Sequence, residues 1–469
     1  MKMKITIAGT LLGCTALMLG HLNSDAVASR GDSTGCNPDV IVGSLHNITK
    51  YGIVGGISAY AVGTTSCNQG CDYLIWEQNS NLHPTIGQNA YMVRELENGC
   101  TRIEQIGMSW LKHGFCALQQ QLCGPCDNPG GFGCTDILGW NCSDPYDSYF
   151  NGQQNNLGPR PEVNASIGSF PWPFTSPAYP QTIGRRLQIE NSLLDEDNYP
   201  GLVRYFVEGH YVHPEDAAAC MSYNNASYRP CEISGSGNNG FNINLTETTR
   251  QMQPAIFAWQ EVDPSVEIRE YTLSDCAQSG RNETFFVGSK VCQLDNGRYH
   301  YEYAVYNLDC DVSFSKFGVP ANDADNVYQF YPKYHSGDGV SVSRWSQGIE
   351  DSLGMMMWRS KTSTDANAIM YNSMHTFSFD SDAEPTEGQA MVGLFKSNED
   401  INIDLVVPSP VDPVIPCNGD IDGNCVVNGQ DLAYVLGNWG SDLGDINGDA
   451  LTNGQDLAIV LADWDCTCQ

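Results

Sequence analysis

The strongest constraint on this sequence is a duplication near its C-terminal end. Residues 420–439 read DIDGNCVVNGQDLAYVLGNW, and residues 445–464 read DINGDALTNGQDLAIVLADW. Each copy holds a loop rich in Asp, Asn and Gly, followed by a short apolar run. Repeats of this kind fold as repeated structural units. We therefore expect two equivalent units, each made of a loop and a short helix.

Oxygen-bearing side chains recur at positions 1, 3, 5, 9 and 12 of both loops, and position 7 adds a backbone carbonyl. Calcium is a hard cation that takes about 6 to 8 oxygen ligands, and this spacing wraps such ligands around a point. The sequence therefore predicts two Ca2+ sites. The predicted ligands are Asp420, Asp422, Asn424, Val426, Asn428 and Asp431 in the first loop and Asp445, Asn447, Asp449, Leu451, Asn453 and Asp456 in the second.

The duplicated segment resembles a type I dockerin over its whole length. The resemblance rests on Asp at position 12, where an EF-hand has Glu, and on one short helix after each loop. It implies that the calcium-folded tail, residues 417–469, docks onto a cohesin domain of another protein. It also implies that positions 10 and 11 help to select the partner, namely Gly429 with Gln430 and Gly454 with Gln455. Because the two pairs are identical, they imply two docking orientations related by a pseudo-twofold axis.

The tail departs from the family pattern at three positions. Position 6, normally Gly, is Cys425 and Ala450, and position 8 of the second loop, normally Val or Ile, is Thr452. We therefore expect weaker calcium binding in the second loop. The tail holds nine Asp and no Lys, Arg or Glu, so their repulsion should unfold it without metal. The alternative, a merely acidic solvated tail, gives no reason for Leu, Val and Trp to repeat in register.

The N-terminal end predicts an export signal over residues 1–28. Lys2 and Lys4 precede an apolar run, and Ala-Val-Ala at 26–28 forms a small-residue cleavage site. A lipoprotein site at Cys14 is the alternative. No other stretch approaches the ~20 apolar residues that span a bilayer. We therefore expect a secreted protein without a transmembrane span, with attachment to a cell surface through the tail as an option.

Charge and cysteine content narrow the class of protein further. The chain has 55 acidic and 23 basic residues, a net charge of -32, which disfavours binding to nucleic acid or anionic membranes. Cleavage after residue 28 leaves 18 cysteines, an even number that predicts disulfides in an exported chain. The Cys-Gly-Pro-Cys sequence at 123–126 copies a thioredoxin-like active site, but Asp-Asn-Pro-Gly-Gly follows and disfavours the required helix. We expect a disulfide-stapled loop region there.

Residues 29–405 predict a mainly β body that contains disulfides. Short alternating runs rich in Val, Ile, Thr and aromatics are typical of strands. The clearest runs are 57–63, 90–95, 202–212, 284–291, 298–307 and 374–380. We expect a β-sandwich, either one large or two in series, with a boundary near residue 235 or a hairpin loop there. The second half loosely resembles β-sandwich segments of exported bacterial proteins. Residues 214–220 predict a short helix, and residues 406–416, with four prolines, an extended linker.

The body contains constellations that could carry chemistry but no catalytic motif. Alternation places Glu208 and His210 on one strand face, where they could do acid–base work or hold a metal, although a solvated face is the favoured interpretation. In the loop-rich stretch 110–174, Asp144 and Glu162 could act as general acid and base on a glycosidic bond. His300, Glu302 and Tyr306 share another strand face, whereas Tyr299, Tyr301 and Tyr303 share the opposite face and are expected to fill the core.

Two classes of function follow from these observations. The first is a secreted modular protein that docks through its tail and carries an extracellular carbohydrate-binding or structural body. The alternative is a glycoside hydrolase or polysaccharide lyase in polysaccharide catabolism, with Asp144, Glu162, Glu208 and His210 as its candidate catalytic residues. A copper or zinc oxidoreductase built on the scattered histidines is a third, weaker hypothesis.

Overall fold

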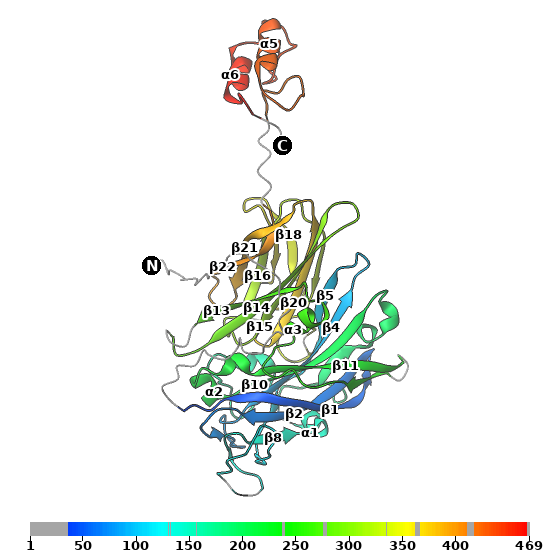
Figure 1. Ribbon diagram of the computed structural model, residues 1–469, viewed down its shortest axis with the longest axis vertical. Coiled ribbons are helices and arrows are strands. Elements are labelled where there is room, and N and C mark those ends of the chain that lie inside the picture. Colours follow the sequence, from blue (N-terminus) through cyan, green and yellow to red (C-terminus); the bar gives the residue numbers. More distant parts are fainter. Residues whose placement is uncertain are drawn as a thin grey trace, which may run out of the picture. The chain divides into compact units, whose positions relative to one another are not determined.

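The computed structural model describes residues 36–129, 131, 133–155, 157–236, 240–274, 279–333, 335–361, 366–409 and 417–466. The predicted signal at 1–28 and residues 410–416 of the predicted linker lie outside the described residues. Those that are described form a mainly β structure with several sheets, followed by two short C-terminal helices (Figure 1). Among them, no helix combines the length and the apolar content that crossing a bilayer requires.

The first half of the body forms one ten-stranded sheet. Its main path runs β1-β2-β9-β5-β4-β10-β11-β12, and β6 and β8 add to β4 and β2. The bounds are β1 (Val40–Val54), β2 (Ile57–Asn68), β4 (Thr85–Glu95), β5 (Thr101–Met108), β6 (Lys112–His113), β8 (Ser143–Tyr146), β9 (Leu187–Glu190), β10 (Val203–Val212), β11 (Ala226–Ser236) and β12 (Gly240–Leu245). The sheet encloses its own core, which includes Val42, Tyr60, Met92 and Val207. A separate ribbon pairs β3 (Leu74–Ile75) with β7 (Ile137–Leu138).

The second half forms two five-stranded sheets. One runs β13-β14-β15-β20-β17 and the other β18-β19-β16-β21-β22. The bounds are β13 (Glu267–Ser274), β14 (Glu283–Gln293), β15 (Tyr299–Asn307), β16 (Phe314–Pro320), β17 (Asp325–Phe330), β18 (Ser346–Glu350), β19 (Met355–Arg359), β20 (Ser373–Ser381), β21 (Pro385–Leu394) and β22 (Asp400–Pro408). Aromatic side chains from both sheets share one core, including Tyr301, Tyr303, Phe317 and Trp358. The expected core role of the tyrosine face is confirmed.

Within the described residues the helices of the body are short. They are α1 (Ser148–Gln153), α2 (Pro214–Ala218) and α3 (Phe257–Val262), with single 3-10 turns at Arg160–Glu162, Asn191–Leu193, Glu196–Asn198 and Ser222–Asn224. The helix predicted at 214–220 is confirmed, although it ends at Ala218. Pro214 occupies its first turn and the His213 ring accepts a hydrogen bond from Glu215 N, so the start of the helix is well capped.

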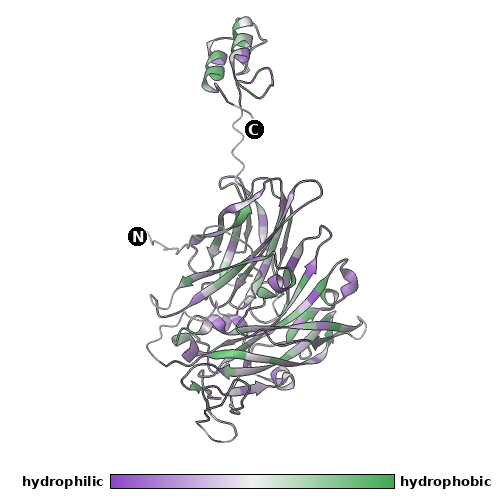
Figure 2. Ribbon diagram, in the orientation of Figure 1, coloured by the Kyte–Doolittle hydropathy of each residue, from purple (hydrophilic) through white to green (hydrophobic). Residues whose placement is uncertain are grey.

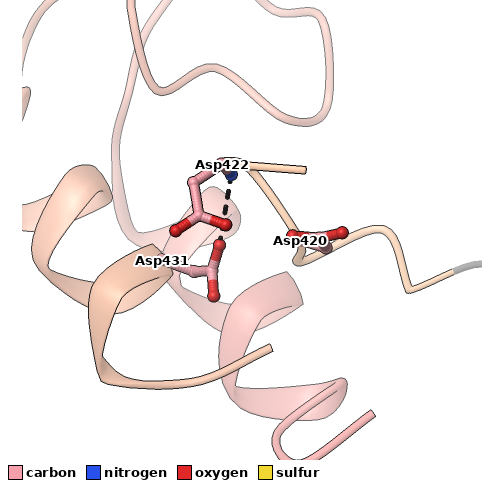
Figure 3. A group of neighbouring side chains, drawn as sticks. All are labelled: Asp420, Asp422 and Asp431. Carbon is pink, nitrogen blue, oxygen red and sulfur yellow. Dashed lines mark hydrogen bonds between the residues drawn. The ribbon is translucent and has the colours of Figure 1, made fainter. Parts of the chain in front are cut away.

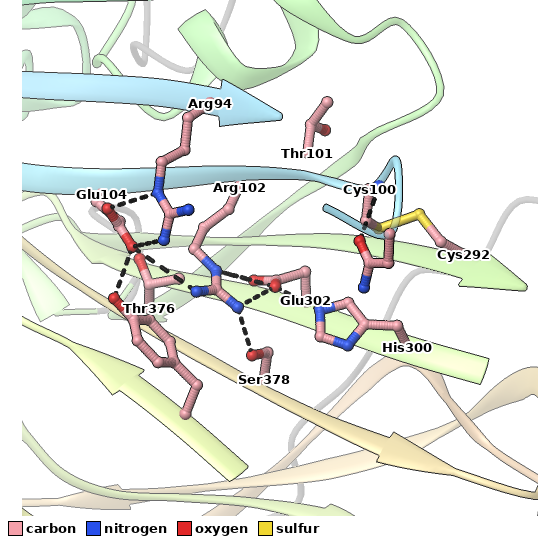
Figure 4. Close-up of polar contacts among 12 residues, drawn as sticks. Arg94, Cys100, Thr101, Arg102, Glu104, Cys292, His300, Glu302, Thr376 and Ser378 are labelled. Atoms are coloured by element: carbon pink, nitrogen blue, oxygen red, sulfur yellow. Dashed lines mark hydrogen bonds and ion pairs between the residues drawn. A yellow bond between two sulfur atoms is a disulfide. The ribbon is translucent and has the colours of Figure 1, made fainter. Parts of the chain in front are cut away.

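A buried polar cluster joins the two halves of the body (Figure 4). Arg102 of β5 donates from Nε to Glu302 of β15 at 2.9 Å and from Nη2 to Ser378 Oγ at 2.7 Å. The His300 ring contacts Glu302 at 2.7 Å and also bonds Asp380. The Cys100–Cys292 disulfide links the same two halves. These contacts, together with an apolar core that contains Tyr91, Phe206 and Tyr306 among others, fix the halves against each other.

The predicted strands are all present, the hairpin alternative near residue 235 is confirmed, and the start of the predicted linker changes. The stretch near residue 235 lies inside a hairpin, because β11 and β12 pair from Cys231 to Leu245. The change from the ten-stranded sheet to the five-stranded sheets falls between β12 and β13. Residues 406–408, predicted as the start of the linker, belong to β22 and pair with Pro385, Thr386 and Glu387 of β21. Apolar residues alternate with polar ones along many of the strands (Figure 2).

Disulfides staple the loop region as expected. Cys123 pairs with Cys67 and Cys126 with Cys142, so the two cysteines of the Cys-Gly-Pro-Cys sequence have different partners. Two further bridges in this part of the body are Cys36–Cys71 and Cys116–Cys134. The even count of cysteines overstated the pairing, however. Within the described residues Cys231 and Cys310 are buried free thiols, and Cys425 is an exposed one.

The C-terminal segment folds as two loop–helix units, α5 (Gly429–Gly437) and α6 (Gly454–Ala462). Val427, Val435 and Val460 are fully buried between them. The Cys417–Cys466 disulfide joins the two ends of this segment. The predicted repeat of loop and short helix is therefore present in the structure, which describes residues 417–466 of the tail.

Candidate functional site

The first loop of the tail gathers carboxylates. One oxygen each from Asp420, Asp422 and Asp431 lies within 4.8 Å of the others (Figure 3). Asp420 and Asp422 come from the start of the loop, whereas Asp431 lies in the first turn of α5. The predicted ligands at positions 1, 3 and 12 are thus brought together by the fold. A purely oxygen donor set suits a hard cation rather than copper or zinc, which prefer nitrogen and sulfur ligands.

The residue at position 12 organises each loop. Asp431 Oδ1 accepts hydrogen bonds from Ile421 N at 2.9 Å and Asp422 N at 3.3 Å. In the second loop Asp456 Oδ1 accepts from the two equivalent amides, Ile446 N at 2.8 Å and Asn447 N at 3.2 Å. The backbone N–H of Asn453 and those two amides lower the pKa of Asp456 and keep it ionised.

The two loops also match in backbone conformation. Asn428 and Asn453 are the N-caps of α5 and α6, both with φ -149° and ψ -162°, and each forms a capping box with the Asp three residues later. Cys425 and Ala450, at position 6, both adopt the left-handed region with φ 65° and 66°. A Cβ in that region costs about 1 to 2 kcal/mol, which explains why Gly is usual at this position.

The second loop accommodates its unusual residue. Thr452 is fully buried, as is Val427 at the equivalent position of the first loop. The Thr452 hydroxyl accepts a hydrogen bond from Gly444 N at 2.9 Å, so its burial leaves no unmet polar group. This contact removes the one departure that is specific to the second loop as a reason for weaker calcium binding there, because Cys425 and Ala450 share the strain at position 6.

The predicted partner-binding residues lie on the surface of the tail. Gly429, Gln430, Gly454 and Gln455 are all exposed. Each glutamine accepts a hydrogen bond from a loop asparagine, although the donors differ in position: Gln430 Oε1 accepts from Asn424 Nδ2 (position 5) at 3.1 Å, and Gln455 Oε1 accepts from Asn447 Nδ2 (position 3) at 3.0 Å. Large apolar side chains are exposed at equivalent positions of the two repeats: Leu436 (53%) with Leu461 (53%), and Trp439 (51%) with Trp464 (42%).

In the body, Glu208 is fully buried rather than solvated, so the favoured interpretation of its strand face is wrong. Its carboxylate accepts hydrogen bonds from five groups. The donors are Ala255 N at 2.6 Å, Asn372 Nδ2 at 2.7 Å, Asn89 Nδ2 at 2.9 Å, Tyr91 OH at 3.1 Å and Tyr306 OH at 3.2 Å. Burial raises the pKa of Glu208, and these donors offset part of that effect.

His210 lies two residues further along β10 on the same face, and it is buried as well. Within the described residues neither ring nitrogen has a hydrogen-bond partner, and the nearby Tyr371 hydroxyl also has none. The two ring centroids are 6.0 Å apart. Burial, reinforced by the positive charge of Arg160, lowers the pKa of His210 to about 3, so this ring is neutral.

Glu162 acts electrostatically on Tyr371, whose ring centroid lies 6.0 Å from that of His210. It follows Arg160, which donates to Asn89 Oδ1 at 2.7 Å, and Asn89 in turn donates to Glu208. Burial raises the pKa of Glu162 to about 7, and its side chain remains half-buried. Three of the four predicted catalytic residues therefore gather in one part of the body.

Asp144 lies elsewhere. It accepts hydrogen bonds from Trp76 Nε1 at 3.0 Å and Leu118 N at 2.9 Å, and burial raises its pKa to about 7. Asp144 acts electrostatically on Tyr211, which points to the opposite face of β10 from His210. The predicted pair of Asp144 and Glu162 is therefore not brought together. Asp144 instead lines a pocket of about 390 Å³ with Phe115, Tyr146 and Phe150.

The sequence did not predict several hydrogen-bond partners of these residues. Asn89 and Asn372 come from separate parts of the chain, and a single asparagine in a strand or loop gives no signal of its own. Comparison with protein-family models and with curated proteins finds no match for this chain.

Proposed function

We propose that this chain is a secreted modular protein whose tail is a type I dockerin that binds two Ca2+ and docks onto a cohesin-type partner. We further propose that its β-sandwich body serves as an extracellular carbohydrate-binding or structural module. The observation that carries the proposal is the convergence of Asp420, Asp422 and Asp431, together with the repetition of the same hydrogen-bond pattern around Asp456.

Calcium would supply the positive charge that these loops lack. The ligands would be the side chains at positions 1, 3, 5, 9 and 12 and the carbonyls of Val426 and Leu451. Metal binding would remove the repulsion among the carboxylates and order the loops. Ordered loops would in turn fix α5 and α6, whose exposed Leu and Trp side chains at repeat-related positions form a surface suited to a protein partner.

The docking step can be tested with the full chain and an immobilised type I cohesin domain. We expect binding in calcium, release in EGTA, and no binding by the double variant Asp420→Ala, Asp445→Ala. The double variant Leu436→Ala, Leu461→Ala should bind calcium normally but lose the cohesin. Calcium uptake without capture by any member of a cohesin panel would reject the docking part while leaving the calcium sites intact.

A hydrolase or lyase is the second candidate function, favoured by Glu162. A half-buried carboxyl with a pKa of about 7, which acts electrostatically on Tyr371 beside the neutral His210, is suited to donate a proton at neutral pH. A polysaccharide panel scored for new reducing ends and for retention separates the two functions. Release of ends that is lost in Glu162→Gln supports the enzyme, whereas retention without release supports the binding module.

A further inference from the structure

Two exposed aromatic side chains in the stapled loop region are held by one carboxylate. Asp127 Oδ2 accepts a hydrogen bond from Tyr73 OH at 2.9 Å and another from Trp140 Nε1 at 2.6 Å. Tyr73 is 39% exposed and Trp140 37% exposed. Their polar edges are therefore directed at the same oxygen atom, and a large part of each ring remains open to solvent.

The backbone that carries this Tyr73–Trp140 pair is strongly restrained. Tyr73 precedes β3 and Trp140 follows β7, and these two strands pair through Leu74 with Leu138 and Ile75 with Ile137. Asp127 N donates to Trp140 O at 3.1 Å, which ties the carboxylate to the second ring through the main chain as well. Three disulfides reinforce this region: Cys36–Cys71, Cys116–Cys134 and Cys126–Cys142.

The hydrogen bonds to Asp127 fix both exposed rings before any ligand binds. A surface tryptophan or tyrosine ordinarily loses rotamer freedom when it binds a ligand, and a ring that is already fixed avoids most of that cost. Aromatic rings also combine an apolar face with a polar edge. Here the polar edges are already occupied by Asp127, so the ring faces are the parts available to a ligand.

The charge around the pair restricts the chemistry of that ligand. Residues 115–147 and 68–80 contain no Lys or Arg, and they carry Asp72, Asp127 and Asp136 close in sequence to the two rings. An acidic surface repels nucleic acid, anionic lipid and acidic polysaccharides. A neutral sugar offers instead a flat C–H face to an aromatic ring and hydroxyl donors to nearby carboxylates.

We propose that Tyr73 and Trp140, oriented by Asp127, form a stacking site for the sugar rings of a neutral polysaccharide. This inference rests on the proposed carbohydrate-binding role of the body. It adds the binding surface, the class of glycan and the positioning residue. Tyr73 and Trp140 contact the sugar, and Asp127 acts through them.

The test is retention of the full chain on insoluble cellulose, xylan and chitin, with alginate as an acidic comparison. We expect retention on at least one neutral polymer and none on alginate. Trp140→Ala and Tyr73→Ala should each weaken binding at least ten-fold, and Asp127→Ala several-fold with a larger loss at higher temperature. Tyr149→Ala, which removes a more exposed aromatic in α1 (56%), is the control and should bind like the parent chain.

The outcomes separate the two levels of the proposal. If the parent chain binds no neutral polymer, the carbohydrate-binding role of the body is wrong, and this inference fails with it. If the parent binds but Trp140→Ala and Tyr73→Ala bind equally well, the role stands and the Tyr73–Trp140 pair is not the site. Because both side chains are exposed, the far-ultraviolet circular dichroism and the thermal unfolding of the variants should match those of the parent chain and show an intact fold.

Discussion

Cys417 and Cys466 are joined by a disulfide that closes the tail across 49 positions of the chain. The bond links Cys417, which precedes the first loop, to Cys466, which follows α6. A bridge over a loop of this length stabilises the folded state by about 4 kcal/mol, chiefly by restricting the unfolded chain. This disulfide opposes the repulsion among the carboxylates. We therefore expect the metal-free tail to keep part of its structure instead of unfolding completely.

The first prediction concerns the double variant Cys417→Ser, Cys466→Ser. In calcium both proteins should show protected amides in α5 and α6. In EGTA the parent tail should keep partial protection, whereas the double variant should lose it, and hydrogen exchange of tail peptides from the full chain measures the difference. Cys425→Ser, which removes a thiol outside the bridge, should behave like the parent. Equal protection of parent and double variant in EGTA would show that the disulfide contributes nothing to the stability of the metal-free tail.

The second prediction concerns the strain at position 6. Ala450 has φ 66°, a conformation that glycine adopts without cost. Ala450→Gly should tighten calcium binding in the second loop by roughly five-fold, equivalent to about 1 kcal/mol. Gly448→Ala is the matched opposite change, because Gly448 has φ 78°, and it should weaken binding. Isothermal titration with calcium checks both. A weaker or unchanged affinity for Ala450→Gly would contradict the strain argument.

The third prediction concerns the polar cluster between the two halves of the body. Arg102→Ala leaves the fully buried Glu302 with the His300 ring as its remaining cationic partner, and breaking a buried ion pair destabilises by roughly 3 to 5 kcal/mol. Arg269 makes a comparable but exposed pair with Glu387, so Arg269→Ala should cost no more than about 1 kcal/mol. Denaturant unfolding of the full chain compares the two variants. Similar losses of unfolding free energy would mean that the buried ion pair contributes no more to stability than the exposed one.

The fourth prediction is a pH dependence that originates at His300. Burial alone would lower the pKa of His300, but Glu302 and Asp380 outweigh it and the pKa is raised. The ring also lies near Arg102, whose charge is balanced by Glu302 and Glu104. A raised pKa adds stability that is fully present below the pKa of an unfolded histidine, about 6.5, and is lost as pH rises through the folded value.

The stability of the parent chain should therefore fall as pH rises above about 6.5. In His300→Gln that part of the decline should be absent, although the variant is less stable at pH 6. Unfolding free energies measured from pH 6 to pH 9 for both proteins give the two slopes. Parallel slopes would contradict a protonated His300 between two carboxylates.

The sequence predicted the local structure of this chain well. Period-two alternation located strands such as Val203–Val212 and Tyr299–Asn307, and the duplication located the two loop–helix units. These features depend on residues close in sequence, where side-chain periodicity and turn chemistry act directly.

The sequence did not predict what surrounds the polar faces of the strands. Glu208 alternates with apolar residues like a residue on a solvated face, yet β15 covers that face and supplies Tyr306. Arg102 and Glu302 are 200 positions apart, and nothing in either segment signals the other. An apolar–polar alternation shows which residues share a face of a strand, but not whether a second sheet covers it.

The central claim is that the tail binds two calcium ions, and titration of the EGTA-treated full chain with calcium by isothermal calorimetry tests it most directly. The account predicts two ions per chain, one for either Asp420→Ala or Asp445→Ala, and none for the double variant. No calcium uptake by the parent chain, or an uptake that the double variant retains, would contradict it.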